Sequence, residues 1–171
     1  MDLKEFDFEG RYENIILDID NCVLDSREWE KYIPTENTRE GWDNYHDHYY
    51  LTTPNPEMID FIEDLYYYGL KRIYFVTARE DINNMREITI NHLKNAFAGR
   101  KWFKKVEKHL FMRNTCDYSP TDKVKEKIML SHIYPYQFIS LAIDDDIRNI
   151  EMYKNWGINT LYYDKFILTN K

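Results

Sequence analysis

Residues 16–23 read ILDIDNCV, and they place two aspartates, Asp18 and Asp20, at the end of a short apolar run. The run within residues 12–19 is rich in β-branched side chains, which is typical of a strand buried inside a parallel sheet. The first strand is therefore expected to stop near Asp18. Because open parallel sheets bind ligands beyond the carboxyl ends of their strands, both aspartates lie where a functional site is expected.

The segments downstream of this strand alternate between helical and strand patterns. Residues 55–69 begin near a proline, carry apolar side chains at helical spacing and end at a glycine, which predicts a helix. Residues 71–77 predict a second buried strand that ends at Thr77, and Asp81 is expected to cap the long helix that follows. Further strands are predicted at 109–112, 140–143 and 159–163, and further helices at 122–132 and 146–156. The alternation predicts an α/β fold, a three-layer Rossmann-like parallel sheet with helices on both faces.

The length of 171 residues suits one compact domain, since such a chain buries roughly 70% of the surface that its unfolded form exposes. Residues 1–171 are therefore predicted to form a single domain. Residues 26–53 interrupt the alternation with an irregular, aromatic-rich segment that Pro54 and Pro56 close. This segment is expected to be a small cap-like insertion over the site, after the first strand.

The composition excludes several classes of protein. Hydrophobic residues make up 43% of the chain and charged residues 31%, as in ordinary soluble domains. The net charge of -7 argues against a protein whose main task is to grip nucleic acid along its length, since that affinity comes from phosphate neutralisation. No stretch approaches about 18 consecutive apolar residues, so the chain is expected to be neither secreted nor membrane-bound. Cys22 and Cys116 have no metal-binding or redox spacing, and a reducing cytoplasm is the expected compartment.

Aspartates are concentrated at the predicted carboxyl ends of two strands. Asp18 and Asp20 follow the first strand, and a later strand ends at Asp144, Asp145 and Asp146. Each close pair of carboxylates would repel by about 4 kcal/mol at an effective dielectric constant near 20. A divalent cation relieves that repulsion, and a set of hard oxygen ligands without histidine or cysteine favours magnesium over zinc. We therefore expect Mg²⁺ as the cofactor.

Four motifs along the chain together resemble the haloacid dehalogenase superfamily of phosphatases. The first is ILDIDNCV, with two aspartates two positions apart after an apolar strand. The second is FVTAR with Thr77, the third is TDKVKEK with Lys125, and the fourth is LAIDDD. All four occur in the order of the family, and the resemblance covers roughly residues 12–165.

Two longer stretches are similar to a narrower group, the 3′-phosphatase domain of phage polynucleotide kinase-phosphatase and its stand-alone phage relatives. They are MRNTCDYSPTDKVKEKIMLSHIYPY at 112–136 and LAIDDDIRNIEMYKNWGI at 141–158. The kinase half of such proteins has no counterpart here, because no glycine opens a GxxxxGK[ST] loop. The resemblance implies a phosphatase without 5′-kinase activity.

The resemblance also implies roles for individual residues. Asp18 would be the nucleophile that attacks phosphorus, and Asp20 would protonate the leaving oxygen and then activate water. Thr77 and Lys125 would hydrogen-bond the phosphoryl oxygens, and Arg79 would hold the substrate phosphate bidentately. Lys125 is preferred as the motif lysine over its neighbours Lys123 and Lys127. Magnesium would be bound by Asp18, the main-chain carbonyl of Asp20, Asp144 and Asp145.

The sequence departs from the family pattern at two places. Asn21 and Cys22 replace the usual Gly-Thr, and asparagine tolerates the left-handed backbone that glycine supplies. Asp146 stands where the closer group often has arginine, and its carboxylate is instead suited to cap the following helix.

Several other residues have both a functional and an ordinary interpretation. The basic run with Trp102 and Phe103 either follows a nucleic-acid backbone or forms a solvated face with its aromatic rings in the core, and the second interpretation is preferred. The cations of that run are Lys94, Arg100, Lys101, Lys104, Lys105 and Lys108. His46 and His48 lack a third metal ligand and are interpreted as surface loop residues. Candidate substrate contacts near the entrance of the site are Asp25, Arg27 and Arg39.

The leading functional hypothesis is removal of a 3′-phosphate from a nucleic-acid end. The insertion at 26–53 is small, so the site is expected to remain open to a polymer. The alternative within enzymes is a small-molecule 5′- or 3′-nucleotidase whose aromatic insertion stacks one base. A non-catalytic receiver-like module also gathers acids, a threonine and a lysine, but its phosphorylated aspartate follows a later strand. An inactive interaction protein is the remaining alternative. The expected partner is a phosphorylated nucleic-acid end or a nucleotide, with no membrane.

Overall fold

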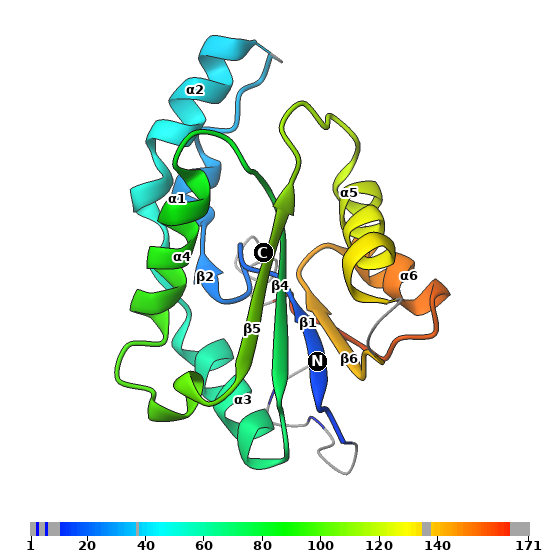
Figure 1. The fold of residues 1–171 in the computed structure, drawn as a ribbon. Coiled ribbons are helices and arrows are strands. Elements are labelled where there is room, and N and C mark those ends of the chain that lie inside the picture. Colours follow the sequence, from blue (N-terminus) through cyan, green and yellow to red (C-terminus); the bar gives the residue numbers. More distant parts are fainter. Residues whose placement is uncertain (1–2, 4–5, 7–10, 37, 135–137, 165–171) are drawn as a thin grey trace.

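The computed structural model describes residues 3, 6, 11–36, 38–134 and 138–164. Its centre is a five-stranded sheet in the order β5-β4-β1-β6-β7, in which every pair of neighbours is parallel (Figure 1). The strands, in chain order, are β1 (Asn14–Leu17), β4 (Arg72–Glu80), β5 (Glu107–Arg113), β6 (Leu141–Asp144) and β7 (Thr160–Tyr162). The apolar strand β1 therefore lies in the middle, between β4 and β6, and the predicted α/β fold is confirmed.

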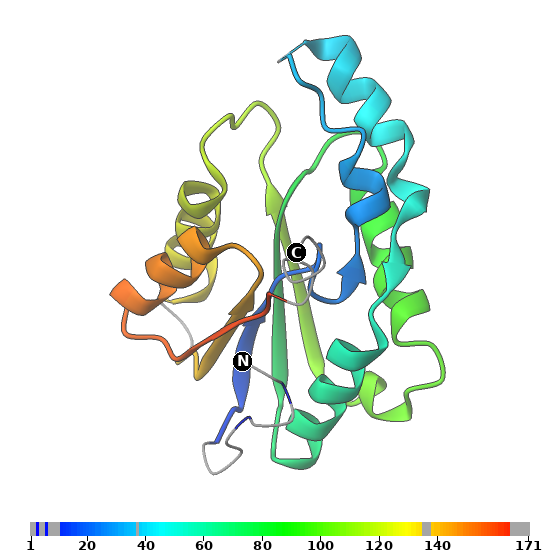
Figure 2. The ribbon, with the colours of Figure 1, turned by 180° about the vertical axis from the view of Figure 1, so that it is seen from behind.

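Helices cover both faces of the sheet. The larger core cluster joins Leu17 and Phe75 to side chains of α3 (Pro56–Tyr67) and α4 (Met85–Ala96). A second cluster joins Ile16 and Tyr74 to α5 (Thr121–Ile128), the π-helical turn η4 (Met129–Ile133) and α6 (Ile147–Asn155) (Figures 1 and 2). Successive residues of β1 and β4 thus point to opposite faces, as the two-residue period of a strand requires. Both layers of helices are anchored in this way.

Strand β4 is longer than the sequence pattern predicted. The strand does not stop at Thr77. Its pairing with β5 is interrupted after Val76 but resumes at Glu80, which pairs with Arg113. Asp81 extends this pairing, since its backbone N–H donates to the Arg113 carbonyl at 2.8 Å. The prediction that Asp81 caps the next helix is wrong, because α4 begins only at Met85 after Asn84.

Residues 26–53 contain more regular structure than expected. The segment begins after β2 (Leu24–Asp25) and ends at β3 (Thr53–Pro54), which pair antiparallel, and it contains α1 (Arg27–Glu30), α2 (Arg39–Asp47) and the 3₁₀ turn η2 (Tyr49–Leu51). None of the side chains of α2 is buried, and most of its residues are polar or charged, so it lacks the apolar content by which the other helices were predicted. Figure 1 shows α2 at the end of the molecule toward which β4 and β5 point.

Among the described residues, no helix is long and apolar enough to cross a membrane.

Candidate active site

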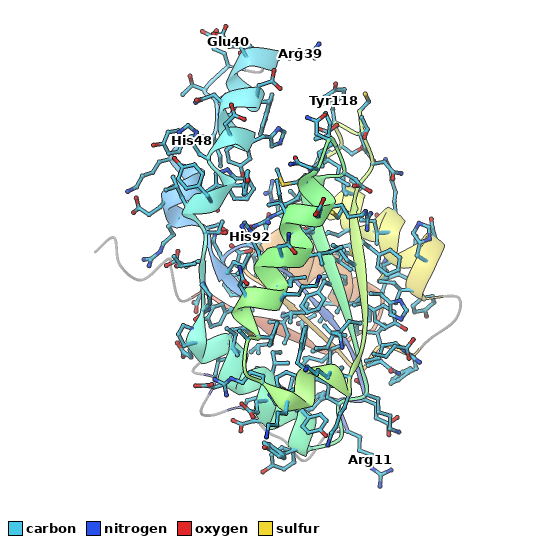
Figure 3. The ribbon with its side chains drawn as sticks, turned by 60° about the vertical axis from the view of Figure 1, so that its left-hand side comes forward. Arg11, Arg39, Glu40, His48, His92 and Tyr118 are labelled. Atoms are coloured by element: carbon cyan, nitrogen blue, oxygen red, sulfur yellow. The ribbon has the colours of Figure 1, made fainter. Side chains whose placement is uncertain are left out.

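A cleft of about 990 Å³ opens at the carboxyl ends of the central strands. It is bordered on one side by α1 and α2 and on the other by the segment between β5 and α5. Figure 3 shows Arg39 on α2 and Tyr118 on that segment at the same end of the molecule. Six of the seven predicted site residues line the cleft, namely Asp18, Asp20, Thr77, Arg79, Lys125 and Asp145. Asp144 does not line it.

Asp18 lies directly after β1 and is almost fully buried, with 5% of its surface exposed. Its backbone N–H donates to the Ile143 carbonyl at 3.0 Å, which continues the sheet pairing and fixes the position of the side chain. Burial raises the pKa of Asp18 well above its ordinary value, the nearby Lys125 lowers it, and Asp144 and Asp145 raise it further. A positive charge next to Asp18 is therefore needed to stabilise its ionised form.

Lys125 links Asp18 to Asp144. Its Nζ atom lies 2.8 Å from Asp18 Oδ1 and 2.8 Å from Asp144 Oδ2, and the side chain is 3% exposed. Although burial opposes its charge, the two carboxylates raise the pKa of Lys125 well above its usual range. The neighbours Lys123 and Lys127 are exposed and pair with acids outside this cluster. Of these three lysines, the structure brings the preferred Lys125 to the acids.

The Asp144 carboxylate is occupied by protein donors. Besides Lys125, it accepts hydrogen bonds from Asn149 Nδ2 at 2.9 Å and from the backbone N–H of Asp146 at 3.1 Å. Asp146 itself accepts from the backbone N–H of Arg148, so its predicted role as a helix cap is confirmed. The geometry gives Asp144 a supporting position behind Lys125, whereas Asp145 faces the cleft.

Asp20 is bound by a fork of hydrogen bonds from Arg79. The Arg79 Nε atom donates to Oδ2 at 2.9 Å, and Nη2 donates to Oδ1 at 2.6 Å. The Ser26 hydroxyl also donates to Oδ1, at 2.6 Å. Although burial opposes the charge, Arg79 and Ser26 hold the pKa of Asp20 below its ordinary value. The Arg79 guanidinium was expected to bind a substrate phosphate bidentately, but in the structure it binds both oxygens of the Asp20 carboxylate.

Arg79 is in turn fixed by residues that the sequence did not indicate. Its guanidinium lies over the Trp29 ring, 4.7 Å from the centroid, and Nη1 donates to the Thr89 hydroxyl at 3.2 Å. The Nη1 atom also approaches His92 of α4 (Figure 3), and burial lowers the pKa of His92 to about 4. The contacts of Trp29 and Thr89 join segments far apart in the chain, so no local pattern could have revealed them.

The turn after Asp20 has the backbone that the sequence predicted. Asn21 has a φ of 56°, so asparagine does supply the left-handed conformation at this position. Its Nδ2 atom donates to Glu30 Oε1 at 2.6 Å, and its Oδ1 atom accepts from the backbone N–H of Ser26 at 3.2 Å. The side chain of Asn21 thereby ties the turn to α1.

Asp18, Cys22 and Asp145 are the one group of ligating side chains found among the described residues, with ligand atoms within 4.8 Å of one another. Burial raises the pKa of the Cys22 thiol well above its ordinary value, and hard cations prefer oxygen ligands to sulfur. Burial and the neighbouring Asp144 raise the pKa of Asp145 to about 6. Two carboxylates whose charge is disfavoured by burial and by neighbouring acids fit a hard divalent cation such as Mg²⁺.

The remaining candidates lie outside this group. His46 lines the cleft and lies within α2, so its interpretation as a loop residue is wrong. His48 lies in the turn after α2 and stacks on Tyr32, with ring centroids 3.7 Å apart. Arg39 lines the cleft and is 96% exposed at its side chain. Asp25 and Arg27 form an ion pair with each other at 2.6 Å.

The strand order, the acidic cluster after β1 and β6 and the buried lysine between them define a haloacid dehalogenase-like phosphatase. The chain belongs to the family described as the polynucleotide kinase PNKP phosphatase domain, whose model matches residues 13–165. No curated protein sequence matches the chain significantly.

Solved structures with the same fold share little sequence with this chain. A chain of the Pnkp1/Rnl/Hen1 RNA repair complex is 16% identical, with a TM-score of 0.58, and the match covers 94% of this chain and 46% of that one. A hydrolase from Streptococcus pneumoniae TIGR4 is 13% identical, with a TM-score of 0.54, and the match covers 92% of this chain and 96% of that one. The protein described here therefore spans about half the length of the repair-complex chain.

Proposed function

We propose that this phosphatase removes 3′-phosphates from nucleic-acid ends, through an aspartyl-phosphate on Asp18 and with Mg²⁺ as cofactor. The observation that carries the proposal is the cleft itself, in which Asp18, Asp20, Thr77 and Lys125 meet at one end of the sheet. The family description supports a polynucleotide substrate. A phosphatase family also favours this function over a receiver-like module or an inactive interaction protein.

In the first step, an oxygen of Asp18 attacks phosphorus, and the bond between phosphorus and the 3′-oxygen breaks. The electron pair of that bond goes to the leaving oxygen, which takes a proton from Asp20. Lys125 and the Thr77 hydroxyl would donate hydrogen bonds to the phosphoryl oxygens as negative charge develops on them. Lys125 suits this role because only two of its three donor positions are occupied by Asp18 and Asp144.

In the second step, Asp20 takes a proton from a water molecule, and the water oxygen attacks the phosphorus of the aspartyl-phosphate. The bond between phosphorus and the Asp18 oxygen breaks, which releases inorganic phosphate and restores the carboxylate. Arg79 and Ser26 stabilise the ionised form of Asp20, which this step requires, and they oppose the protonated form from which Asp20 donates in the first step. We infer that Arg79 positions Asp20, a role that differs from the expected phosphate clamp.

The side chains of Asp18 and Asp145 would hold the magnesium ion, together with the main-chain carbonyl of Asp20. Bound Mg²⁺ supplies positive charge that offsets the charge of the carboxylates and the phosphate. Asp144 acts beside this site by fixing Lys125, because its carboxylate is already occupied by Lys125 and Asn149. We further propose that residues 26–53 act as a small cap, since Ser26 and Trp29 contact Asp20 and Arg79.

The substrate assignment is tested by phosphate release from matched oligonucleotides and mononucleotides that carry either a 3′- or a 5′-phosphate. We expect magnesium-dependent release from 3′-phosphorylated oligonucleotides, and loss of that release when a chelator removes the metal. Faster turnover of mononucleotides would instead identify a nucleotidase. Release that continues unchanged with chelator present would contradict the magnesium site.

Replacement of Arg79 by lysine separates its two interpretations. Lysine keeps the positive charge but lacks the planar fork that binds both oxygens of Asp20. If Arg79 positions Asp20, Arg79→Lys should lower kcat by about 10²-fold, within the range of general acid–base catalysis, and leave KM nearly unchanged. A rise in KM with an unchanged kcat would show that Arg79 clamps the substrate phosphate.

A further inference from the structure

A second cavity, of about 690 Å³, lies away from the active-site cleft. It is formed where the end of α3 meets the 3₁₀ turn η3 (Lys101–Lys104) that precedes β5. Figure 1 shows these segments at the end of the sheet opposite α2. The side chains that matter for binding are Tyr66, Tyr67, Lys101, Trp102 and Lys105, and we call this site the distal pocket. None of them has a part in the proposed reaction.

The exposed ring of Tyr67 in the distal pocket packs against a row of further aromatic rings. Tyr67 is 73% exposed, and its ring packs edge-to-face on Tyr66 at a centroid distance of 5.6 Å. Tyr66 stacks on Trp102, also at 5.6 Å, and Trp102 is buried against Phe97 of the core. The preferred interpretation of the basic run is confirmed for its rings, because Trp102 is buried and Phe103 is partly buried against the core, whereas the exposed ring of the distal pocket is Tyr67. A fixed and exposed ring is suited to stacking on a nucleobase.

Two lysines, Lys101 and Lys105, line the distal pocket, and Lys104 precedes Lys105 in the chain. Lys101, Lys104 and Lys105 are exposed, and within the described part of the chain no acid forms an ion pair with them. By contrast, Arg100 is paired with Asp60 and Glu63, and four of the exposed lysines elsewhere are paired with acids. Those paired lysines are Lys31, Lys71, Lys123 and Lys127. In a protein with a net charge of -7, three uncompensated cations beside a cavity form a local site for a polyanion.

We propose that the distal pocket binds single-stranded nucleic acid, with one base stacked on Tyr67 and the adjacent phosphates paired with Lys101 and Lys105. A single strand fits better than a duplex, because stacking on Tyr67 requires an unpaired base with a free face. Glu63 also lines the pocket, but its carboxylate is paired with Arg100, and the proposed binding involves no chemical step. Its connection to catalysis rests on the proposed polynucleotide substrate.

Helix α3 sets the distance between the two sites. The helix begins near the turn after Asp20, since Asn55, which precedes its first residue, donates from Nδ2 to the Cys22 carbonyl at 2.7 Å, and its last residue is Tyr67. A helix of 12 residues is about 18 Å long. A strand with about 3.4 Å per nucleotide needs on the order of five nucleotides to cover that distance. A 3′-phosphorylated strand longer than this could contact both sites at once.

Binding of fluorescent oligonucleotides without terminal phosphates tests the proposal separately from catalysis. We expect Tyr67→Ala to weaken binding by about 10-fold, since base stacking on aromatic rings is lost, and Tyr67→Phe to restore it. Lys101→Glu should weaken binding and reduce the slope of log K against log salt by about 0.7, the value for one phosphate contact on a single strand. The control is Lys154→Glu, on the last turn of α6 and away from the pocket. Circular dichroism confirms that each variant is folded.

Two results would contradict the proposal that the distal pocket binds single-stranded nucleic acid. One is binding that the Tyr67 and Lys101 variants leave unchanged, and the other is equal weakening by Lys154→Glu, which would show a general effect of charge.

Kinetics then test the link to the active site. The value of KM for 3′-phosphorylated strands should fall once their length exceeds about five nucleotides, and Lys101→Glu/Lys105→Glu should remove that dependence without changing turnover of a 3′-mononucleotide. Failure of the polynucleotide assignment would remove this kinetic effect but not the binding.

Discussion

Asp18→Asn is expected to lower phosphate release by more than about 10⁴-fold, because no other side chain can replace the attacking oxygen. The folded structure should survive, since the backbone hydrogen bond from Asp18 to Ile143 is independent of the side chain. Turnover is measured with saturating magnesium and an excess of enzyme, so that slow residual release remains visible. Substantial activity in the variant would exclude Asp18 as the nucleophile.

The same variant should be more stable than the wild type when a chelator is present. Burial raises the pKa of Asp18 in spite of Lys125, so the charged carboxylate is unfavourable in the metal-free fold. Asparagine has nearly the same shape and no charge, and Lys125 retains Asp144 as a partner. Thermal unfolding with chelator should therefore give a higher Tm for Asp18→Asn. A lower Tm would show that the pair with Lys125 outweighs the cost of burial.

Lys125→Met is expected to lower both the stability of the fold and the rate of phosphate release. It leaves Asp18 and Asp144 buried without their shared cation, and breaking a buried ion pair in this way costs about 3–5 kcal/mol. The loss of a donor to the phosphoryl oxygens should lower kcat by about 10²–10³-fold. Denaturant unfolding and steady-state kinetics measure the two effects.

A matched control and a double mutant distinguish the loss of stability from the loss of catalysis. Lys127 is in the same helix but is 60% exposed at its side chain, so Lys127→Met should change stability by no more than about 0.5 kcal/mol. The double variant Lys125→Met/Asp144→Asn removes one of the two stranded charges and should recover part of the lost stability, but not the activity. Recovery of activity would mean that Lys125 acts only by neutralising Asp144.

The fold was largely predictable because its signals are local. Short apolar runs such as β1 and β6 are buried on both faces of a parallel sheet, and the helices between them show apolar side chains at helical spacing. Helix α2 was missed because no side chain of it is buried, and the start of α4 was misplaced because Asp81 continues the pairing of β4 with β5. Only the second error depends on a contact between distant segments.

The candidate site was predictable as a set of residues but not as an arrangement. The predicted strand ends indicated Asp18, Asp20 and Thr77, and the resemblance to the family added Lys125. Neither could show that Arg79 binds Asp20, since this fork depends on where β4 places the arginine relative to the turn after β1.

The sequence by itself determined the order of strands and helices, the family and the identity of the acids and the lysine at the cleft. Those features are encoded in local apolar periods and in short motifs. Only the tertiary structure decided that Asp144 supports Lys125 while Asp145 faces the cleft, and that Tyr67 stands exposed beside three unpaired lysines. Such pairings depend on side-chain direction and burial, which arise when segments far apart in the chain pack together.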